Sequence, residues 1–328
     1  MRIAVSGSIA NDYLMTFPGQ FTEHIVPDQL DRVSLSFLID GLEIRRGGVA
    51  ANICFGAGQL GLGPLLVGSV GRDFFNDYEP HLAAQGVDTS AVYVSESCHT
   101  AMFLCTTDQN ENQIASFYPG AMDEASNIDL RDIAASHGEP DLVVVCPNEP
   151  GAMHRHTEQA LEAGWPVAAD PSQQLPRLDG DGVRRLIDGA TYLLSNDYEA
   201  TLIESKSGWS SDEVLRRVGL RITTHGPKGC VIERRGEPTL EVGAVAPRED
   251  ARLEPTGVGD AFRAGFVGAL AKHLDLEHCA QVGALMATLA LETVGPQEYA
   301  ITGNGALDRL AQAYDDDAAA AAEPLLTG

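Results

Sequence analysis

Hydrophobic residues follow two kinds of pattern along the chain, and each kind predicts a different element. Short unbroken apolar runs bounded by Gly, Pro or polar residues predict buried strands, and polar stretches with an apolar residue every three or four positions predict helices. The runs expected as strands are residues 3–8, 64–68, 142–146, 166–169, 192–194, 221–224 and 230–233. The stretches expected as helices lie around residues 127–138, 151–164, 179–189 and 209–218, and further helices begin near 48 and 258. Strands that alternate with helices predict a parallel sheet covered on both faces.

Two segments, at about residues 13–46 and 98–120, interrupt this alternation with strand-like patterns. The first carries aromatic and charged residues in short alternating pieces, such as residues 34–38. The second holds two apolar runs, at 101–107 and 113–118. We expect the strands of both segments to form one small β-sheet lid over the larger sheet.

The size of the chain favours a single domain. Its 328 residues, of which 44% are hydrophobic, are enough to build one large core. We therefore expect residues 1–328 to fold together. The tail at residues 315–328 is biased towards Asp and Ala, and a frayed helix is expected there.

The charge of the chain limits its partners. With 22 basic and 47 acidic residues, the formal net charge is -25. No basic stripe is available to neutralise phosphates, which argues against nucleic acid or an anionic membrane surface as a partner. Small molecules are the expected partners, although solubility or adaptation to salt explains an acidic composition equally well.

The cysteines and the N-terminus favour a cytoplasmic protein. Six cysteines are scattered without a C-x-x-C pair, and several lie inside apolar runs, as Cys146 does. We expect small core residues in a reducing cytosol. The N-terminus runs directly into Ile3 to Val5 without the pattern of a signal peptide, and no apolar run reaches the length that spans a membrane.

A Gly-rich turn before a helix is the strongest chemical signal. Gly257, Val258 and Gly259 leave backbone N–H groups free to converge, and the apolar residues that follow recur at helical spacing: Phe262, Phe266, Ala269 and Leu270. Free N–H groups and the positive end of the helix dipole make an anion site, for which phosphate is the natural guest. Asp260 stands at this site, where a general base for a phosphoryl acceptor is one interpretation and a helix cap is the other.

Polar residues near the start of the chain suggest a sugar site. Asp12 lies just beyond the first strand, where it can hold sugar hydroxyls or form an ordinary Asx-turn. Gly47 and Gly48 open the next helix, and Asn52 falls in its first turn.

Two further sets follow directly on strands, at the carboxyl edge where α/β proteins bind ligands. Asn196 and Glu199 lie three residues apart, and their oxygens suit Mg²⁺ and its water shell, although a helix N-cap with a capping-box acid has the same pattern. Thr224, Gly226 and Gly229 belong to a Gly-rich turn that suits a nucleotide contact or a simple hairpin.

These motifs, taken in order, resemble those of the ribokinase-like (PfkB) sugar kinases. They are Gly47-Gly48 with Asn52, Asn196-x-x-Glu199, Thr224-x-Gly226 and Thr256-Gly257-x-Gly259-Asp260. Residues 34–38, 116–122 and 170–175 look like the bacterial adenosine kinases of that family. The resemblance covers nearly the whole chain.

The resemblance implies a three-layer α/β/α domain with a small β lid, and a reaction in which ATP phosphorylates the 5′-hydroxyl of adenosine. Asp260 would be the general base, and the N–H groups of Gly257, Val258 and Gly259 would stabilise the transferred phosphoryl group. The nucleoside would contact Ser8, Asp12, Ser36, Gly48, Asn52, Phe103, Phe117, Gln173 and Arg177. The nucleotide would contact Asn196, Thr224, Gly226, Gly229, Gly257 and Gly259. Asn196 and Glu199 would organise Mg²⁺ through water.

Several alternatives remain open. Another nucleoside or sugar kinase of the family, similar to ribokinase or fructokinase, fits the same motifs, and a non-catalytic nucleoside sensor is a third interpretation. A monovalent cation is a further candidate cofactor. The aromatic residues of the lid, Phe103, Phe117 and Tyr118, can clamp a purine, form the lid's own core, or join two lids in a homodimer. Glu254 replaces the Asp that most family members have at the head of the anion-site motif.

Overall fold

The computed structural model of the chain describes residues 1–24 and 35–327. Its largest sheet has the strand order β14-β13-β12-β11-β10-β9-β1-β4. The strands are β1 (Ile3–Ser6), β4 (Leu65–Val67), β9 (Leu142–Val145), β10 (Val167–Ala169), β11 (Tyr192–Asn196), β12 (Leu220–Thr224), β13 (Cys230–Glu233) and β14 (Leu240–Val242). Neighbouring strands from β4 to β12 pair in parallel, as predicted.

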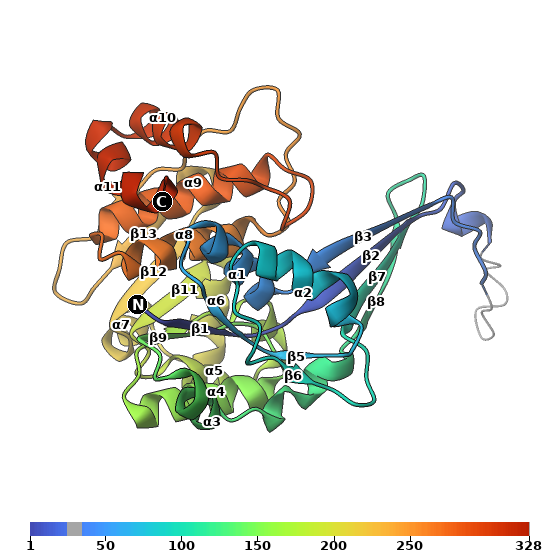
Figure 1. Cartoon of the computed structure of the whole chain (residues 1–328), viewed down its shortest axis with the longest axis horizontal. Coiled ribbons are helices and arrows are strands. Elements are labelled where there is room, and N and C mark those ends of the chain that lie inside the picture. The colour runs from blue at the N-terminus through green and yellow to red at the C-terminus, as the bar shows by residue number, and fades with distance from the viewer. Residues whose placement is uncertain (25–34, 328) are drawn as a thin grey trace.

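Helices cover both faces of this sheet, because successive side chains of each strand enter two different cores. Ile3 and Val5 pack in one core, and Ala4 packs in the other. The first core includes α1 (Val49–Gln59), α2 (Phe74–Ala84), α8 (Val258–Ala271), α9 (Leu276–Leu291), α10 (Gly303–Ala313) and α11 (Asp316–Leu326). The second core includes α3 (Leu130–His137), α4 (Pro150–Ala163), α5 (Gly180–Ile187), α6 (Asp197–Ser207) and α7 (Ser211–Arg217). The result is the predicted three-layer α/β/α arrangement (Figure 1).

The ends of the helices differ in a way that matters for the site. Among the described residues, seven helices begin at a residue whose side chain accepts an N–H of the first turn: Asp129, Glu149, Asp179, Asn196, Ser210, Asp275 and Asp315. In contrast, α1 and α8 begin at Gly48 and Gly257, which have no side chain to cap them. The first turn of α8 is therefore open to other partners, whereas the first N–H of α1 is accepted by the side chain of Ser8.

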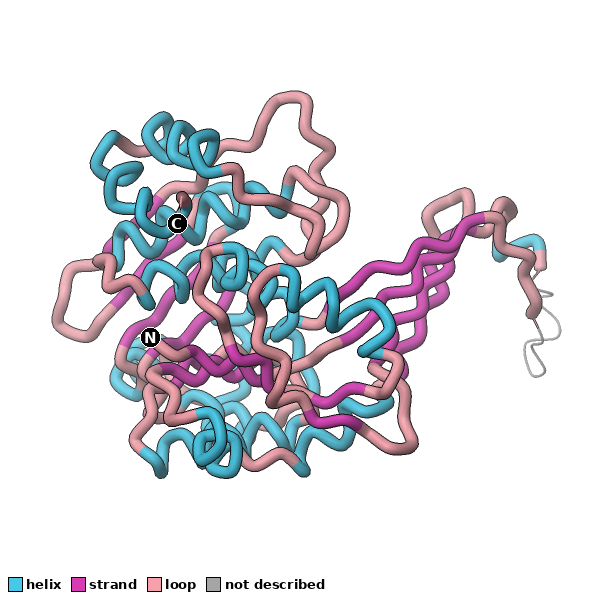
Figure 2. Tube along the Cα trace, in the orientation of Figure 1, coloured by secondary structure: helices cyan, strands magenta, loops and turns pink. Residues whose placement is uncertain are grey.

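The lid is a second sheet that projects from the body as a long arm (Figures 1 and 2). Its strands are β2 (Ala10–Thr16), β3 (Gly41–Gly47), β7 (Ala101–Thr107) and β8 (Gln113–Tyr118), in the order β3-β2-β7-β8. A small third sheet pairs β5 (Ser69–Val70) with β6 (Tyr93–Val94). Short 3-10 helices are η1 (Phe21–Glu23), η3 (Gly120–Asn127), η4 (Ser172–Arg177) and η5 (Gly226–Lys228).

Two predictions about irregular segments are wrong. The tail is not a frayed helix, because α11 buries Ala322 and Leu325 in the first core and begins at a capped turn. Residues 35–39 are not a strand but an irregular stretch, although Phe37 packs its ring against Phe17 and Phe21. Residue 34 of that predicted strand lies outside the described residues.

The sheet is not parallel throughout. Strand β13 runs antiparallel to β12, and β14 runs antiparallel to β13. Only residues 225–229 separate β12 from β13, and so short a connection allows a hairpin but no parallel crossover. The hairpin alternative for this turn is confirmed. Within residues 1–24 and 35–327, no helix has both the length and the apolar composition needed to cross a membrane.

Candidate active site

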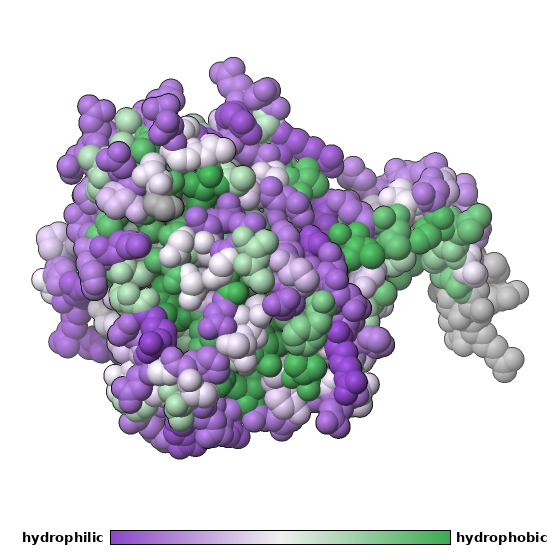
Figure 3. Space-filling view, viewed as in Figure 1, coloured by the Kyte–Doolittle hydropathy of each residue, from purple (hydrophilic) through white to green (hydrophobic). Residues whose placement is uncertain are grey.

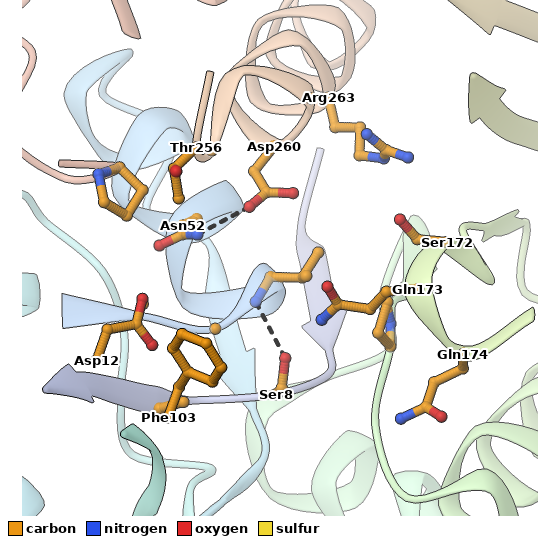
Figure 4. Close-up of a pocket in the computed structure, with 18 of the residues that line it drawn as sticks. Ser8, Asp12, Asn52, Phe103, Ser172, Gln173, Gln174, Thr256, Asp260 and Arg263 are labelled. Atoms are coloured by element: carbon orange, nitrogen blue, oxygen red, sulfur yellow. Dashed lines mark hydrogen bonds between the residues drawn. The ribbon is translucent and has the colours of Figure 1, made fainter. Parts of the chain in front are cut away.

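A cleft of about 690 Å³ lies between the carboxyl ends of the parallel strands and the base of the lid. It brings together most of the residues predicted for substrate, cofactor and catalysis. These are Ser8, Asp12, Gly48, Asn52, Phe103, Phe117, Gln173, Arg177, Asn196, Glu199, Gly257, Gly259 and Asp260. Figure 4 shows Asp12 and Phe103 on the lid side of the cleft, with Asp260 and Arg263 on the opposite side.

The N-terminus of α8 faces this cleft with its first turn uncapped. Gly257 has a left-handed backbone with φ of 78°, and a Cβ atom there would come within 2.4 Å of the Pro296 Cβ. The N–H of Val258 makes only a long bond of 3.4 Å to the carbonyl of Pro255. The turn can therefore direct N–H groups at an anion. Asp260 does not cap this helix, so the cap interpretation of that residue is wrong.

Asp260 is held by a residue from another helix. Asn52 Nδ2 donates a hydrogen bond of 2.8 Å to Asp260 Oδ2 (Figure 4). Burial raises the pKa of Asp260, whereas the positive charge of Arg263 and the bond from Asn52 lower it. A carboxylate in this setting can accept a proton, which is what a general base requires.

Arg263 forms a buried ion pair beneath the anion site, which the sequence did not lead us to predict. Its guanidinium contacts Asp170, with 2.6 Å between Arg263 Nη2 and Asp170 Oδ1. Its Nη2 also lies 3.7 Å from Glu199 Oε2. The spacing of Asp260 and Arg263, three residues apart on one helix, is the signal that could have indicated Arg263.

Asn196 and Glu199 form a capping box and also line the cleft. Asn196 Oδ1 accepts the N–H of Glu199, and Glu199 Oε2 accepts the N–H of Asn196, each at 2.8 Å. Ser172 Oγ donates to Glu199 Oε1 at 3.0 Å. The capping-box interpretation and the Mg²⁺ interpretation of this pair are therefore compatible, since a carboxylate that caps a helix retains lone pairs for a metal-bound water.

The lid side of the cleft carries Asp12, Phe103 and Phe117 on one face. Asp12 is paired with Phe103 across β2 and β7, and Phe103 is paired with Phe117 across β7 and β8. Asp12 thus belongs to a strand, and the Asx-turn interpretation is wrong. Burial raises the pKa of the Asp12 carboxyl to about 6, despite the lowering effect of Arg45.

Gly48 lies between lid strand β3 and helix α1, at the point where the lid joins the body, which we call the hinge of the lid. At this position the backbone approaches the end of the first strand closely. The φ of Gly48 is 93°, and a Cβ atom there would lie 2.6 Å from the carbonyl oxygen of Ser8. Ser8 Oγ accepts the N–H of Val49 at 3.0 Å and caps α1 from a distance (Figure 4). A side chain at position 48 would therefore displace the hinge.

Some predicted residues are not among those that line the cleft. Ser36 is exposed beside Phe37 at the far end of the lid, so the expectation that it completes the nucleoside pocket of its own chain is not met. Val258 is the first residue of α8, and only its backbone is relevant to the anion site. Thr224 is paired with Asn196 at the sheet edge, and Gly226 and Gly229 belong to the turn beyond it.

Other residues line the cleft without having been assigned a role from the sequence, although Gly47 and Thr256 belong to the motifs described above. They are Ala10, Gly47, Val49, Met122, Pro147, Ser172, Gln174, Thr256, Arg263 and Pro296. Ser172 has a positive φ of 39°, which is rare for a residue with a side chain. Gln174 belongs to the 170–175 segment that resembles the bacterial adenosine kinases, but the sequence alone assigned only Gln173 to the cleft.

Glu254 links the anion site to the lid. Glu254 Oε1 accepts a hydrogen bond of 2.7 Å from Thr256 Oγ1, and its other oxygen lies 3.7 Å from Arg45 Nη1 on β3. The longer side chain at this position therefore supports the loop before α8 and reaches the lid.

Comparison with known proteins agrees with this geometry. A family model for the pfkB family carbohydrate kinases matches residues 17–302. The nucleoside kinase of Methanocaldococcus jannaschii is 30% identical over 269 residues, which are 80% of this chain and 85% of that protein. The ligand-free nucleoside kinase of Burkholderia thailandensis has 37% identity and a TM-score of 0.83, and covers 94% of this chain and 99% of its own. Its complex with inosine has 34% identity and a TM-score of 0.81, with coverages of 95% and 98%.

The fold and the cleft define a ribokinase-like α/β kinase. The chain belongs to the pfkB family of carbohydrate kinases, and it is a phosphotransferase that uses an alcohol group as acceptor. The predicted family and fold are confirmed, and the interpretation as a non-catalytic sensor loses its support.

Proposed function

We propose that this kinase transfers the γ-phosphoryl group of ATP to the 5′-hydroxyl of purine nucleosides, with Asp260 as general base. One observation supports this most. A single cleft joins Asp260, the uncapped N-terminus of α8, and a lid face that carries Asp12, Phe103 and Phe117 at neighbouring positions of three strands.

In the proposed reaction, Asp260 accepts the proton of the 5′-hydroxyl as its oxygen attacks the γ-phosphorus. The bond from phosphorus to the β–γ bridging oxygen breaks, and ADP leaves with the electron pair. Asn52 keeps the carboxylate in place, and the N–H groups of Gly257, Val258 and Gly259 stabilise charge on the transferred phosphoryl group. General base catalysis contributes about 10²- to 10⁴-fold in rate.

The nucleoside is proposed to bind between the lid and the strand ends. Asp12 would accept hydrogen bonds from the ribose hydroxyls, and Gly48 and Asn52 would support the same sugar. Phe103 and Phe117 would stack on the base, since stacking on an aromatic ring is favourable for any purine. Ser8, Gln173 and Arg177 would complete the pocket.

The comparisons favour a broader substrate range than adenosine alone. The B. thailandensis enzyme is a nucleoside kinase that binds inosine. Adenosine has an amino donor at the position where inosine has a carbonyl acceptor. Gln173 and Gln174 both line the cleft, and a carboxamide offers either a donor or an acceptor when it rotates. We therefore propose that adenosine is one of several accepted purine nucleosides, and that free ribose and fructose are poorer substrates.

ATP is proposed to lie along the sheet edge from the N-terminus of α8 to Thr224, with Gly226 and Gly229 in the adjoining turn. Asn196 and Glu199 would hold Mg²⁺ through water, because both Glu199 oxygens already accept hydrogen bonds. Among the described residues, no group of three or more His, Cys, Asp or Glu side chains is arranged to hold a metal ion. When bound, Mg²⁺ would neutralise charge on the phosphates.

The test is a comparison of kcat/KM for adenosine, inosine, guanosine, ribose and fructose with MgATP, in the presence and absence of K⁺. Mass spectrometry and ³¹P NMR of the products identify the phosphorylated hydroxyl. We expect 5′-monophosphates from at least two purine nucleosides, at higher kcat/KM than either sugar. A kcat/KM that is higher for ribose or fructose, or a product phosphorylated elsewhere, would contradict the proposal.

We also propose that two copies associate through the outer faces of their lids. Alternation along the strands places apolar side chains on the face opposite Asp12 and Phe103, among them Tyr13, Leu42, Ile44, Leu104 and Ile114. Leu42 and Ile44 are each 57% exposed, and Figure 3 shows hydrophobic surface along the arm. Two chains of net charge -25 repel each other, so an uncharged surface is where they can approach.

A cytoplasmic location remains a proposal. The six cysteines all lie within the described residues and are free thiols, and five of them are buried. Unpaired cysteines are expected in a reducing compartment.

A further inference from the structure

A path of hydrogen bonds joins the hinge of the lid to the carboxylate of Asp260. Tyr78 OH donates to the carbonyl oxygen of Gly47 at 2.6 Å. Gln297 Nε2 donates to Tyr78 OH at 2.6 Å and to Asn52 Oδ1 at 2.8 Å. Asn52 Nδ2 then donates to Asp260 Oδ2 at 2.8 Å. The path therefore connects α2, the loop after α9, and the first turns of α1 and α8.

The two ends of the path fix the orientation of every group within it. The carbonyl of Gly47 can only accept, so the single hydroxyl proton of Tyr78 points to it, and the Tyr78 oxygen must accept from the amide nitrogen of Gln297. At the other end, the ionised carboxylate of Asp260 can only accept. Asn52 therefore presents its nitrogen to Asp260 and its oxygen to Gln297.

This path is shielded from solvent. Tyr78 is 2% exposed, Gln297 is 1% exposed and Asn52 is 6% exposed. Buried polar groups lose substantial free energy when a partner is removed, since water cannot replace it. Tyr78 also packs its ring against Phe74 in the first core, so its hydroxyl is held in a fixed position.

The hinge end of the path is the backbone where the lid joins the body. Gly47 is the last residue of β3, and Gly48 precedes α1 with a φ of 93°. A rotation of the backbone at this point moves the lid strand and also turns the Gly47 carbonyl that accepts from Tyr78. The position of the lid and the hydrogen bond are thus coupled by geometry.

We propose that Tyr78 and Gln297 are positioning residues of the kinase reaction, which fix the orientation of the Asp260 carboxylate. The bond from Tyr78 to Gly47 ties that orientation to the hinge of the lid. This inference rests on the proposed role of Asp260 as general base. Neither positioning residue touches the substrate, because neither lines the cleft.

The fall of kcat at low pH, the acid limb of the pH profile, measures whether the Asp260 carboxylate is correctly positioned. The bond from Asn52 lowers the pKa of Asp260, so loss of its orientation raises that pKa and moves the acid limb of kcat to higher pH. Two other charged groups also affect the pKa of Asp260: Arg263 on the same helix lowers it, and Glu199 at the start of α6 raises it. The charge of Asp260 in turn raises the pKa of Asp170 after β10, of Tyr299 and of Cys146. None of these is changed by the substitutions below, apart from the control.

The experiment compares Tyr78→Phe, Gln297→Met and the double variant with the control Tyr299→Phe. Tyr299 is also buried, and within the described residues its hydroxyl has no hydrogen-bond partner. We expect Tyr78→Phe and Gln297→Met each to lower kcat about tenfold and to shift its acid limb to higher pH, with little change in the KM for ATP. The double variant should lose no more than the worse single variant, because both act through one path. The control should match the wild type in kcat and in the acid limb.

Thermal unfolding of each variant separates positioning from folding. If Tyr78→Phe and Gln297→Met lower the melting temperature but keep the kcat and the acid limb of the control, the positioning inference is wrong. If Asp260→Asn is inactive while Tyr78→Phe and Gln297→Met behave like the control, only the positioning inference fails, and the proposal that Asp260 is the general base stands. If Asp260→Asn retains normal turnover, the proposed function itself has failed.

Discussion

Asn52 Nδ2 lies 2.8 Å from Asp260 Oδ2, although the two residues are 208 positions apart in the sequence. Asn52 is in the first turn of α1 and Asp260 is in the first turn of α8. Both helices begin at the cleft and pack against each other. The contact therefore depends on how closely these two helices approach.

The first prediction concerns Asp260 itself. Asp260→Asn should lower kcat about 10²- to 10⁴-fold, because the amide cannot accept the 5′-hydroxyl proton. Nucleoside affinity, measured by calorimetry, should stay close to that of the wild type. Near-normal kcat in this variant would rule out Asp260 as the general base.

The second prediction concerns the packing of α1 on α8. A Cβ atom at Gly56 would come within 2.6 Å of the Ala264 Cβ and 2.5 Å of the Tyr299 hydroxyl. Gly56→Ala should separate the helices, lower the free energy of unfolding by about 1–3 kcal/mol, and reduce kcat by moving Asn52 from Asp260. Denaturant unfolding and steady-state kinetics measure both effects. Gly243→Ala is the matched control, since a Cβ there meets no atom within 4 Å.

The sequence predicts the parts of the site that lie in local patterns. Asp260, Asn196 and Glu199 were found because each sits at a helix start after a strand or a Gly-rich turn. Arg263 and its partner Asp170 are 93 residues apart, and no local pattern connects them. Such pairs depend on the packing of elements that are distant in the chain.

The dependence on contacts between distant elements also explains which parts of the fold were predicted wrongly or missed. Helix α9 was not predicted, because it is buried on most sides and lacks the polar stripe that marks an amphipathic helix. Helix α11 was expected to fray, because its composition does not reveal that Ala322 and Leu325 find partners in the first core. Ser36 was assigned to the pocket by resemblance, but its backbone lies at the far end of the lid.

The third prediction concerns the ionisation of Asp12. Its folded pKa of about 6 lies above the ordinary value of 3.8, so the folded state binds this proton more tightly than the unfolded state. The stability contributed by the neutral carboxyl is present below about pH 4 and is lost as the pH rises through 6. Asp12→Asn should therefore raise the melting temperature at pH 8 and have little effect at pH 4.

Asp12→Asn should weaken nucleoside binding even though it raises the melting temperature at pH 8. The ionised Asp12 makes the stronger bonds to ribose hydroxyls, so Asp12→Asn should weaken nucleoside binding about tenfold or more, and ATP binding much less. In the wild type, nucleoside affinity should fall as the pH drops below 6. The exposed loop residue Asp250 offers the control Asp250→Asn. Equal losses for nucleoside and ATP would show that Asp12 has only a structural role.

The fourth prediction concerns association through the lid. Ile44→Lys places a charge at the centre of the proposed outer interface, and desolvating it there would disfavour a dimer. Light scattering should show a dimer for the wild type and a monomer for Ile44→Lys. Leu253→Lys is the control, because Leu253 is also exposed, at 52%, but is not in the lid. A wild-type monomer at all protein concentrations would contradict this proposal.

The fifth prediction separates the two faces of the lid. Phe117 and Ile114 lie on the same strand, β8, and are exposed to similar extents, 48% and 44%, but they point to opposite faces because their positions differ by three. Of these two residues, only Phe117 lines the cleft, and Phe103, its partner on the neighbouring strand, lines it too. Stacking on a base is worth about 1–3 kcal/mol in alanine substitutions. Phe117→Ala should therefore raise the KM for adenosine and inosine about 5- to 100-fold and leave the KM for ATP nearly unchanged, whereas Ile114→Ala should leave all three close to wild type. If the two variants behave alike in nucleoside kinetics, Phe117 does not stack on the base, and the aromatic residues of the lid serve its own packing instead.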